Sequence, residues 1–201
     1  MSQSETLLPI APGPQYARCD GILWTSVIVS SAGRVFATFP AAVVVVIVNR
    51  REELLLLESP RRRGWWEPVN GAVDAGETLL EAALREVREE VGLELRVRPL
   101  GVVHASTFAY DALVQRVISV TYLMAHEGGD PVPGDDMRGS RVRWASADDV
   151  DTRGLRLVPP LDQAWLRRRT IELFRLWESS PDVPLQGALA ESGWNKAEHA
   201  G

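Results

Sequence analysis

The segment Gly71–Leu93, GAVDAGETLLEAALREVREEVGL, constrains the fold more than any other part of the chain, because it joins a glycine-containing loop to one strongly patterned helix. Four apolar residues recur in it at spacings of four, three and four positions: Leu80, Leu84, Val87 and Val91. This spacing predicts an amphipathic helix over 78–91 that buries one stripe against a core. Gly92 follows the last apolar residue directly and is a typical helix stop.

The same predicted helix carries three glutamates on one face. At roughly 100° of rotation per residue, Glu86, Glu89 and Glu90 fall together and away from the apolar stripe. Three carboxylates within about one turn repel one another, and the adjacent Arg85 and Arg88 cannot neutralise all of them. Clustered carboxylate oxygens suit Mg²⁺ or Mn²⁺, and these ions bind phosphate oxygens in turn. The alternative is an ordinary solvated helix rich in Glu and Arg.

The complete pattern resembles the Nudix box, the signature motif of the Nudix hydrolases (MutT-like pyrophosphohydrolases). That motif consists of Gly, five residues, Glu, seven residues and then Arg-Glu-apolar-any-Glu-Glu-any-Gly-apolar. Its fixed positions are all matched here, by Gly71, Glu77, Arg85, Glu86, Val87, Glu89, Glu90, Gly92 and Leu93. The resemblance implies an α/β fold, namely an α/β/α sandwich around a mixed sheet, and an enzyme that hydrolyses diphosphate bonds.

The resemblance also implies which residues carry the chemistry. Glu86, Glu89 and Glu90 match the family's metal ligands, and we expect the metal to be Mg²⁺, with Mn²⁺ as the alternative. Arg85 matches the arginine that braces these carboxylates, so we group it with them as a catalytic residue. The family takes a further ligand from a backbone carbonyl at the position of Asn70, where Gly is usual. Asn supplies a carbonyl and tolerates left-handed backbone geometry, so we include it among the metal ligands.

Three other motif positions are expected to be structural. Gly71 permits a tight loop at the start of the motif, and Gly92 ends the helix. Glu77 matches a family position that closes the loop through hydrogen bonds. None of these three residues is expected to touch the substrate.

The segment before the motif, 59–70 with the sequence SPRRRGWWEPVN, combines cations with large aromatic rings. Three consecutive arginines at 61–63 precede Trp65 and Trp66, so we expect an exposed loop. In one interpretation Arg63 contacts a substrate phosphate and Trp66 packs against a base. In the other, the loop is only charged and a Trp anchors it to the core.

The residue that activates water is not fixed by the motif. In the family, an acidic residue of a later loop often completes the site shortly before a strand that carries Trp, and here that strand contains Trp144. The acidic, glycine-rich loop 127–140 offers Asp135, Asp136 and Glu127, beside the carboxylates of the helix itself. For each of the three, a solvated loop position is the alternative.

Patterns outside the motif predict a mixed sheet between helices, with extra N-terminal strands. Strands are expected at 21–30, 34–39, 41–48, 53–57, 94–105, 114–125 and 141–145, and further helices at 146–150 and 161–177. We therefore divide the chain into an N-terminal extension with a strand pair (1–40), a Nudix domain (41–178) and a C-terminal tail (179–201). A short helix at 185–194 is a further expectation for the tail. Such N-terminal sheets build dimers in some Nudix subfamilies, so a homodimer is an expected assembly.

Composition excludes several classes of protein. The net charge of −5 argues against a general nucleic-acid binder, and the single cysteine, Cys19, excludes an intramolecular disulfide and a cysteine-based metal site. The longest apolar run, at 41–48, is too short to span a membrane, and residues 1–15 lack the pattern of a secretory signal. We expect a cytoplasmic protein that acts on a nucleotide-type small molecule, without membrane or nucleic-acid partners.

The favoured activity is Mg²⁺-dependent hydrolysis of a nucleoside diphosphate linked to another group. The substrate is open between ADP-ribose or a nucleotide sugar, which the extra N-terminal strands favour, and a dinucleoside polyphosphate. Tyr110 favours the latter, because it stands 17 residues after Leu93, where dinucleoside polyphosphate hydrolases commonly have a Tyr. We include it as a candidate substrate-binding residue. The alternative to an enzyme is a non-catalytic protein, namely a silent, nucleotide-binding Nudix module. A protein that only binds has no need of a strained carboxylate cluster.

Overall fold

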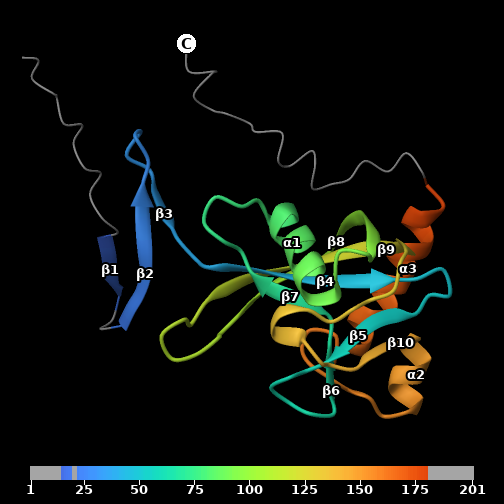
Figure 1. Cartoon of the computed structure of the whole chain (residues 1–201). Coiled ribbons are helices and arrows are strands. Elements are labelled where there is room, and N and C mark those ends of the chain that lie inside the picture. The colour runs from blue at the N-terminus through green and yellow to red at the C-terminus, as the bar shows by residue number, and fades with distance from the viewer. Residues whose placement is uncertain (1–14, 20–21, 181–201) are drawn as a thin grey trace, which may run out of the picture. The chain divides into compact units, whose positions relative to one another are not determined.

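The computed structural model describes residues 15–19 and 22–180 (Figure 1). Its contacts separate the chain into two compact units, residues 1–40 and residues 41–201. The short helix expected at 185–194 lies outside the described residues. Among the residues that are described, no helix is long and apolar enough to cross a membrane.

The smaller unit is a three-stranded antiparallel sheet with the order β1-β2-β3. Its strands are β1 (Gln15–Cys19), β2 (Ile22–Val29) and β3 (Val35–Ala37). The turn between β2 and β3 closes through the N–H of Gly33, which donates to the carbonyl of Ser30 at 2.8 Å, and Gly33 adopts the φ of +77° that favours glycine. The extra N-terminal strands are confirmed. The prediction of only a pair was wrong, because a third strand, β1, precedes the two that were expected.

The larger unit contains one mixed sheet of eight strands. The strands are β4 (Ala41–Val48), β5 (Leu54–Glu58), β6 (Trp65–Glu67), β7 (Val69–Ala72), β8 (Arg96–Phe108), β9 (Val117–Gly128), β10 (Val142–Ala145) and β11 (Arg156–Leu157). The helices are α1 (Leu79–Val91), the 3₁₀ helix η1 (Asp135–Met137), α2 (Ala147–Thr152) and α3 (Ala164–Glu178).

The sheet is organised around β4. Its main path runs β11-β6-β5-β4-β9-β8, with β7 paired to β4 and β10 paired to β5. The pairs β4·β9 and β6·β11 are parallel and the other pairs are antiparallel, so the sheet is mixed, as predicted. The short β7 brings the start of the motif, through the pairing of Asn70 with Val44, against the centre of the sheet.

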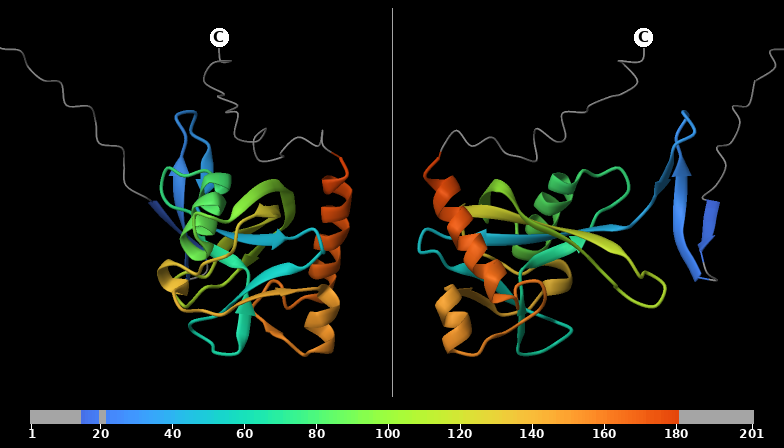
Figure 2. Two further views of the ribbon diagram at one scale, coloured as in Figure 1. Left: turned by 45° about the vertical axis from the view of Figure 1, so that its right-hand side comes forward. Right: turned by 180° about the vertical axis from the view of Figure 1, so that it is seen from behind.

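Helices cover both faces of this sheet, as Figure 2 shows for α1 and α3. Alternate residues of β4 and β5 serve the two faces because side chains alternate along a strand. Val46, Val48 and Leu56 belong to the core cluster under α3, whereas Ile47 and Leu57 belong to the cluster under α1. Burial on both sides explains why these two strands are unbroken apolar runs in the sequence. The predicted α/β fold with helices on both sides of a mixed sheet is confirmed.

β11 was not predicted, and two further strands were missed just before the helix α1. The segment 59–70 was predicted to be a loop, but it contains β6 and, at its end, the start of β7. These strands are three and four residues long, which is too short to show a clear period. They exist because β5 and β4 supply their backbone partners, so their pairing is tertiary information.

Candidate metal-binding and catalytic site

Helix α1 starts at a fixed point because its first turn is capped by its own side chains. The Oγ1 of Thr78 accepts a hydrogen bond from the N–H of Glu81 at 3.2 Å, and the Glu81 carboxylate accepts the N–H of Thr78 at 2.9 Å. This reciprocal pair is a capping box. At the other end the N–H of Gly92 donates to the carbonyl of Arg88 at 3.1 Å, and Gly92 has a φ of +89°. The helix therefore spans the predicted positions, and its carboxylates are held in a fixed rotation.

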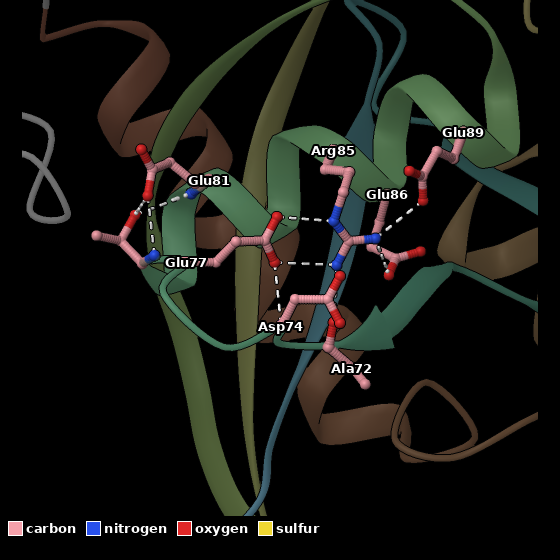
Figure 3. A network of polar contacts seen from close by, with 8 residues as sticks. Ala72, Asp74, Glu77, Glu81, Arg85, Glu86 and Glu89 are labelled. Atoms are coloured by element: carbon pink, nitrogen blue, oxygen red, sulfur yellow. Dashed lines mark hydrogen bonds and ion pairs between the residues drawn. The ribbon is translucent and has the colours of Figure 1, made fainter.

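Arg85 is the centre of a polar network that joins the loop to the helix (Figure 3). Its Nε and Nη2 donate to the two carboxylate oxygens of Glu77 at 2.7 and 3.1 Å. Its Nη1 donates to Glu86 at 2.8 Å and to Glu89 at 2.9 Å, and Nη2 also donates to the carbonyl of Ala72 at 2.9 Å. One guanidinium thus sets the positions of two of the proposed metal ligands.

Glu77 fastens the loop between β7 and α1. Besides its two bonds from Arg85, it accepts the N–H of Asp74 at 3.1 Å, and these contacts hold the pKa of its carboxyl below the ordinary value. A charged carboxylate with every partner inside the loop and helix is suited to a structural role. The geometry therefore supports the role expected for Glu77.

Glu86 packs directly against the backbone of Gly71. A Cβ atom added to Gly71 would lie 1.8 Å from Oε1 of Glu86, so no other residue fits there unless the carboxylate moves. Burial raises the pKa of Glu86 above its ordinary value even though Arg85 opposes this shift. The first glycine of the motif is therefore explained by the close approach of a carboxylate, which the sequence alone did not reveal.

Glu90 is the most buried acid of the helix, with 4% of its surface exposed. Its carboxylate accepts the N–H of Asn70 at 3.3 Å, and it forms no ion pair with any residue in 15–19 or 22–180. Burial raises the pKa of Glu90 to about 9. A buried carboxylate of this kind is costly when charged unless a cation approaches it. Asn70 thus meets Glu90 through its backbone N–H, and metal ligation by its carbonyl stays a prediction.

Two more acids come close to Glu86 and Glu90. Burial is the main cause of the raised pKa values of Glu86 and Glu90, and the charge of Asp136, in η1, raises both further, as it does the pKa of Glu67 in β6. Burial is the main cause of the raised pKa of Glu67. Of the three later acids named from the sequence, Asp136 is thus brought to the carboxylates. Glu127 instead accepts Nε of Arg98 at 2.8 Å.

Glu67 was missed in the sequence, although a signal for it existed. Its neighbour Trp66 lies in the core cluster under α3, and side chains alternate along β6. Glu67 must therefore face the side of the sheet that carries α1. Recognising this required knowing that WWE is a strand, which the sequence pattern did not show.

The buried face of α1 also differs from the predicted one. Val87 and Val91 are buried as expected, but Leu80 and Leu84 are only partly buried against the same cluster. Glu86 and Glu90 are buried among the apolar residues instead of lying on a separate solvated face. The ordinary solvated helix considered as an alternative is therefore excluded.

The carboxylate oxygens of Glu86, Glu89 and Glu90 are of the chemical type that binds a divalent cation. As the side chains stand, no group of three His, Cys, Asp or Glu residues within the described part of the chain is arranged to hold a metal ion. Arg85 engages Glu86 and Glu89, while Glu90 turns to Asn70. The predicted ligands are neighbours but not preassembled. The buried carboxyl of Glu90 nevertheless has no cationic partner within the described residues, and a hard cation would supply that charge.

The three predicted substrate-binding residues are not brought together. Arg63 is exposed in the loop between β5 and β6, and Tyr110 is 63% exposed in the loop between β8 and β9. Trp66 is buried in the core under α3, with the guanidinium groups of Arg141 and Arg143 over its ring at 5.4 and 4.8 Å. This is the arrangement of the anchoring interpretation. Substrate contact by Arg63 and Tyr110 stays a prediction.

A cavity of about 380 Å³ opens beside Glu89. It lies between α1 and the segment that leads into η1, and its charged lining residues are Arg85, Arg88, Arg138, Glu89 and Asp135. Because Glu89 belongs both to this cavity and to the carboxylate set, the cavity adjoins the candidate metal site.

The NUDIX domain family matches residues 38–173. This stretch includes the motif, the larger sheet, the helix α1 on one of its faces and most of α3 on the other. The chain belongs to this family. No curated protein matches the chain by sequence. The resemblance identified from the motif is thereby confirmed.

Solved structures show the same fold. A NUDIX-family hydrolase from Clostridium perfringens matches with a TM-score of 0.54 and 18% identity, over 68% of this chain and 96% of that one. A NUDIX hydrolase from Nitrosomonas europaea matches with a TM-score of 0.52 and 21% identity, over 69% and 90%. An ADP-ribose pyrophosphatase from Streptococcus suis matches with a TM-score of 0.50 and 20% identity, over 69% and 93%. At these identities the likeness establishes the fold alone.

Proposed function

We propose that this Nudix protein is a hydrolase that cleaves a diphosphate bond in a nucleotide-type substrate with the help of Mg²⁺ or Mn²⁺. The observation that carries the proposal is the buried carboxyl of Glu90, which forms no ion pair within residues 15–19 and 22–180. It lies near Glu86, whose one cationic partner, Arg85, is shared with two other acids. A fold that had no use for a cation at this place would be more stable with neutral groups there.

Glu86, Glu89 and Glu90 are the residues that would hold the cation, which supplies charge stabilisation at phosphate oxygens and a more acidic water. Arg85 orients Glu86 and Glu89 from one side and is itself fixed by Glu77 and the carbonyl of Ala72. This anchoring keeps the carboxylates in place although they repel one another.

Asp136 is the favoured proton acceptor. It is the acid of the loop 127–140 that comes near Glu86 and Glu90, and it is exposed to solvent. An exposed carboxylate beside a buried acidic cluster can accept a proton from water and release it to solvent. We retain the helix glutamates as alternatives for this step.

The substrate is proposed to be a nucleoside diphosphate linked to another group, and the fold leaves several such groups open. The S. suis structure with the same fold is an ADP-ribose pyrophosphatase, which keeps ADP-ribose among the candidates. Chromatography of the products formed from a panel of deoxynucleoside triphosphates, ADP-ribose, nucleotide sugars and dinucleoside polyphosphates identifies the preferred class.

Replacement of the proposed ligands tests the activity. We expect Glu89→Gln and Glu90→Gln each to lower Mg²⁺-dependent turnover by more than about 100-fold, since even residues that only orient metal ligands cost 10- to 100-fold when removed. Circular dichroism should show an intact fold in both. Glu172→Gln, at an exposed glutamate of α3, is the matched control and should keep normal activity. Normal turnover in both site variants would exclude these glutamates as the metal ligands, whereas no turnover of any panel substrate by wild type would favour the silent binding module.

A further inference from the structure

The cavity beside Glu89 has a fixed wall. The segment before η1 is hydrogen-bonded to the last turn of α1, with the N–H of Val132 on the carbonyl of Val91 at 2.9 Å and the N–H of Gly134 on the carbonyl of Glu90 at 3.1 Å. A Cβ atom on Gly134 would lie 2.5 Å from the carbonyl oxygen of Glu89, so the two backbones are in closest contact there. The space of about 380 Å³ is therefore bounded on two sides by paired backbone.

Two arginines of this cavity have no partner. Arg88 and Arg138 are both exposed, and their guanidinium groups form no ion pair or hydrogen bond within residues 15–19 and 22–180. Arg85, by contrast, is fully engaged by Glu77, Glu86 and Glu89. Within the described residues, all ion pairs of the α1 arginines are therefore made by Arg85. The guanidinium of Arg88 stays available to bind an anion from outside the protein.

The acids of the cavity do not cancel these charges. Glu89 is already paired with Arg85 at 2.9 Å, which leaves Asp135 as the acid facing Arg88 and Arg138. Arg85, Arg88 and Gly92 follow one another at spacings of three and four, so they share the helix face that is turned to the cavity. The balance of free charge in the cavity is positive, directly beside a set of carboxylates.

We propose that Arg88 and Arg138 form a phosphate subsite, which binds a phosphoryl group of the substrate next to the diphosphate bond that is cleaved. The inference rests on the proposed function, because it is Glu89 that relates the cavity to the proposed metal ligands. The guanidinium fork binds phosphate oxygens with two parallel hydrogen bonds, and one arginine comes from the helix while the other follows η1.

This subsite selects among the open substrate classes. A nucleoside triphosphate or a dinucleoside polyphosphate places a further charged phosphoryl group beside the cleaved bond. In ADP-ribose and in nucleotide sugars, the group beyond the diphosphate is an uncharged sugar that gives an arginine pair no anion. The subsite therefore favours substrates with at least three consecutive phosphates.

Binding without turnover tests the subsite by itself. The probe is inorganic tripolyphosphate, titrated calorimetrically into the full chain in EDTA. We expect wild-type protein to bind it, and we expect Arg88→Gln, Arg138→Gln and the double variant to bind it at least about tenfold more weakly. Arg169→Gln, at an exposed arginine of α3 on the opposite face of the sheet, is the control and should bind like wild type. No binding by wild type, or equal binding by all variants, would overturn the subsite.

Kinetics provide the second readout. For a nucleoside triphosphate the double variant should show a KM raised by about tenfold or more with kcat retained, whereas its KM for ADP-ribose should not change. Equal changes for both substrates would contradict a phosphate subsite. If wild-type protein hydrolyses no substrate of the panel, the proposed function fails, and the tripolyphosphate titration still decides on the subsite.

Discussion

Glu90 is the residue whose charge conflicts most with its surroundings, and the conflict has a measurable consequence. Burial raises its pKa from 4.5 to about 9 in the folded chain. The folded state therefore binds a proton more tightly than the unfolded state, so this group's contribution to stability is complete below about pH 4.5 and is lost as the pH rises towards 9. At pH 8 without metal, Glu90 is ionised in the unfolded chain but still largely protonated in the folded chain, so the raised pKa makes the fold less stable than at pH 4.5.

We predict that Glu90→Gln makes the metal-free protein more stable at pH 8, by on the order of 2 kcal/mol, while it removes metal-dependent activity. Gln keeps the acceptor for the N–H of Asn70 but carries no charge. Urea unfolding in EDTA at pH 5 and pH 8 measures the effect, which should be larger at pH 8. Glu172→Gln should show no such difference between the two pH values. A variant no more stable than wild type at pH 8 would contradict the prediction.

The candidate site residues could be named from sequence, but their environment could not. Helical spacing grouped Glu86, Glu89 and Glu90, and the resemblance to the Nudix box added Arg85 and the role of each. The burial of Glu86 and Glu90 depends on the docking of β7 and of the segment before η1, which come from other parts of the chain. Glu67 was missed for the same reason, since its approach to Glu90 is created by the pairing of β6 with β5.

At the scale of elements, length and burial decided which strands could be predicted. β4 and β5 are apolar without interruption because both of their faces are covered, so the sequence alone shows them. β6, β7 and β11 are two to four residues long and contain Trp, Glu, Asn, Gly or Arg. Their strand geometry is imposed by neighbours, and no local pattern records it.

The arginine-rich loop between β5 and β6 is held by the side chain of Arg141, which directly precedes β10. Nε and Nη2 of Arg141 donate to the Glu58 carboxylate at 2.7 and 2.8 Å, and that carboxylate also accepts the N–H of Gly64 at 2.8 Å. These contacts, Arg141 first, lower the pKa of Glu58 to about 2. The Glu58 carboxylate is therefore charged throughout the neutral pH range. Its contacts with Arg141 and Gly64, here called the Glu58 clasp, close the loop that contains the arginines at 61–63.

We predict that Arg141→Gln loosens this loop. Glu58 would keep only Gly64 as a partner, so the loop should open more often and trypsin should cut after the arginines at 61–63 about tenfold faster. Timed digestion followed by mass spectrometry measures the rate. Arg153→Gln, which breaks the pair of Arg153 with Asp149 in α2, is the matched control and should leave cleavage at 61–63 unchanged. Equal cleavage rates in wild type and Arg141→Gln would show that the clasp does not hold the loop.

At the scale of the whole molecule, the alternation of strands and helices was sufficient to predict an α/β sandwich, and the motif placed its most informative helix. What the sequence could not supply was the pairing order of the strands, in which β4 joins β9 in parallel although long segments separate them. Such pairings depend on how the two apolar faces of the sheet are covered. The division into an extension, a Nudix domain and a tail stays a proposal.

The extension suggests how the assembly can be tested. In the three-stranded sheet of the smaller unit, Ile28 pairs with Phe36 on one face and Val29 with Val35 on the other, because side chains alternate along a strand. All four are 47–63% exposed, and exposed apolar pairs of this kind are typical of an interaction surface. We predict that the full chain is a homodimer through this sheet and that residues 41–201 alone are a monomer.

Light scattering after size-exclusion chromatography measures both masses. Val35→Glu and Phe36→Glu together should convert the full chain to a monomer, because charges in an apolar interface remain without partners once buried. Asp111→Asn, in the exposed loop between β8 and β9 of the larger unit, is the control and should leave the mass unchanged. A full chain with the mass of one protomer would contradict the dimer. A dimer that survives both glutamate substitutions would place the interface elsewhere in the molecule.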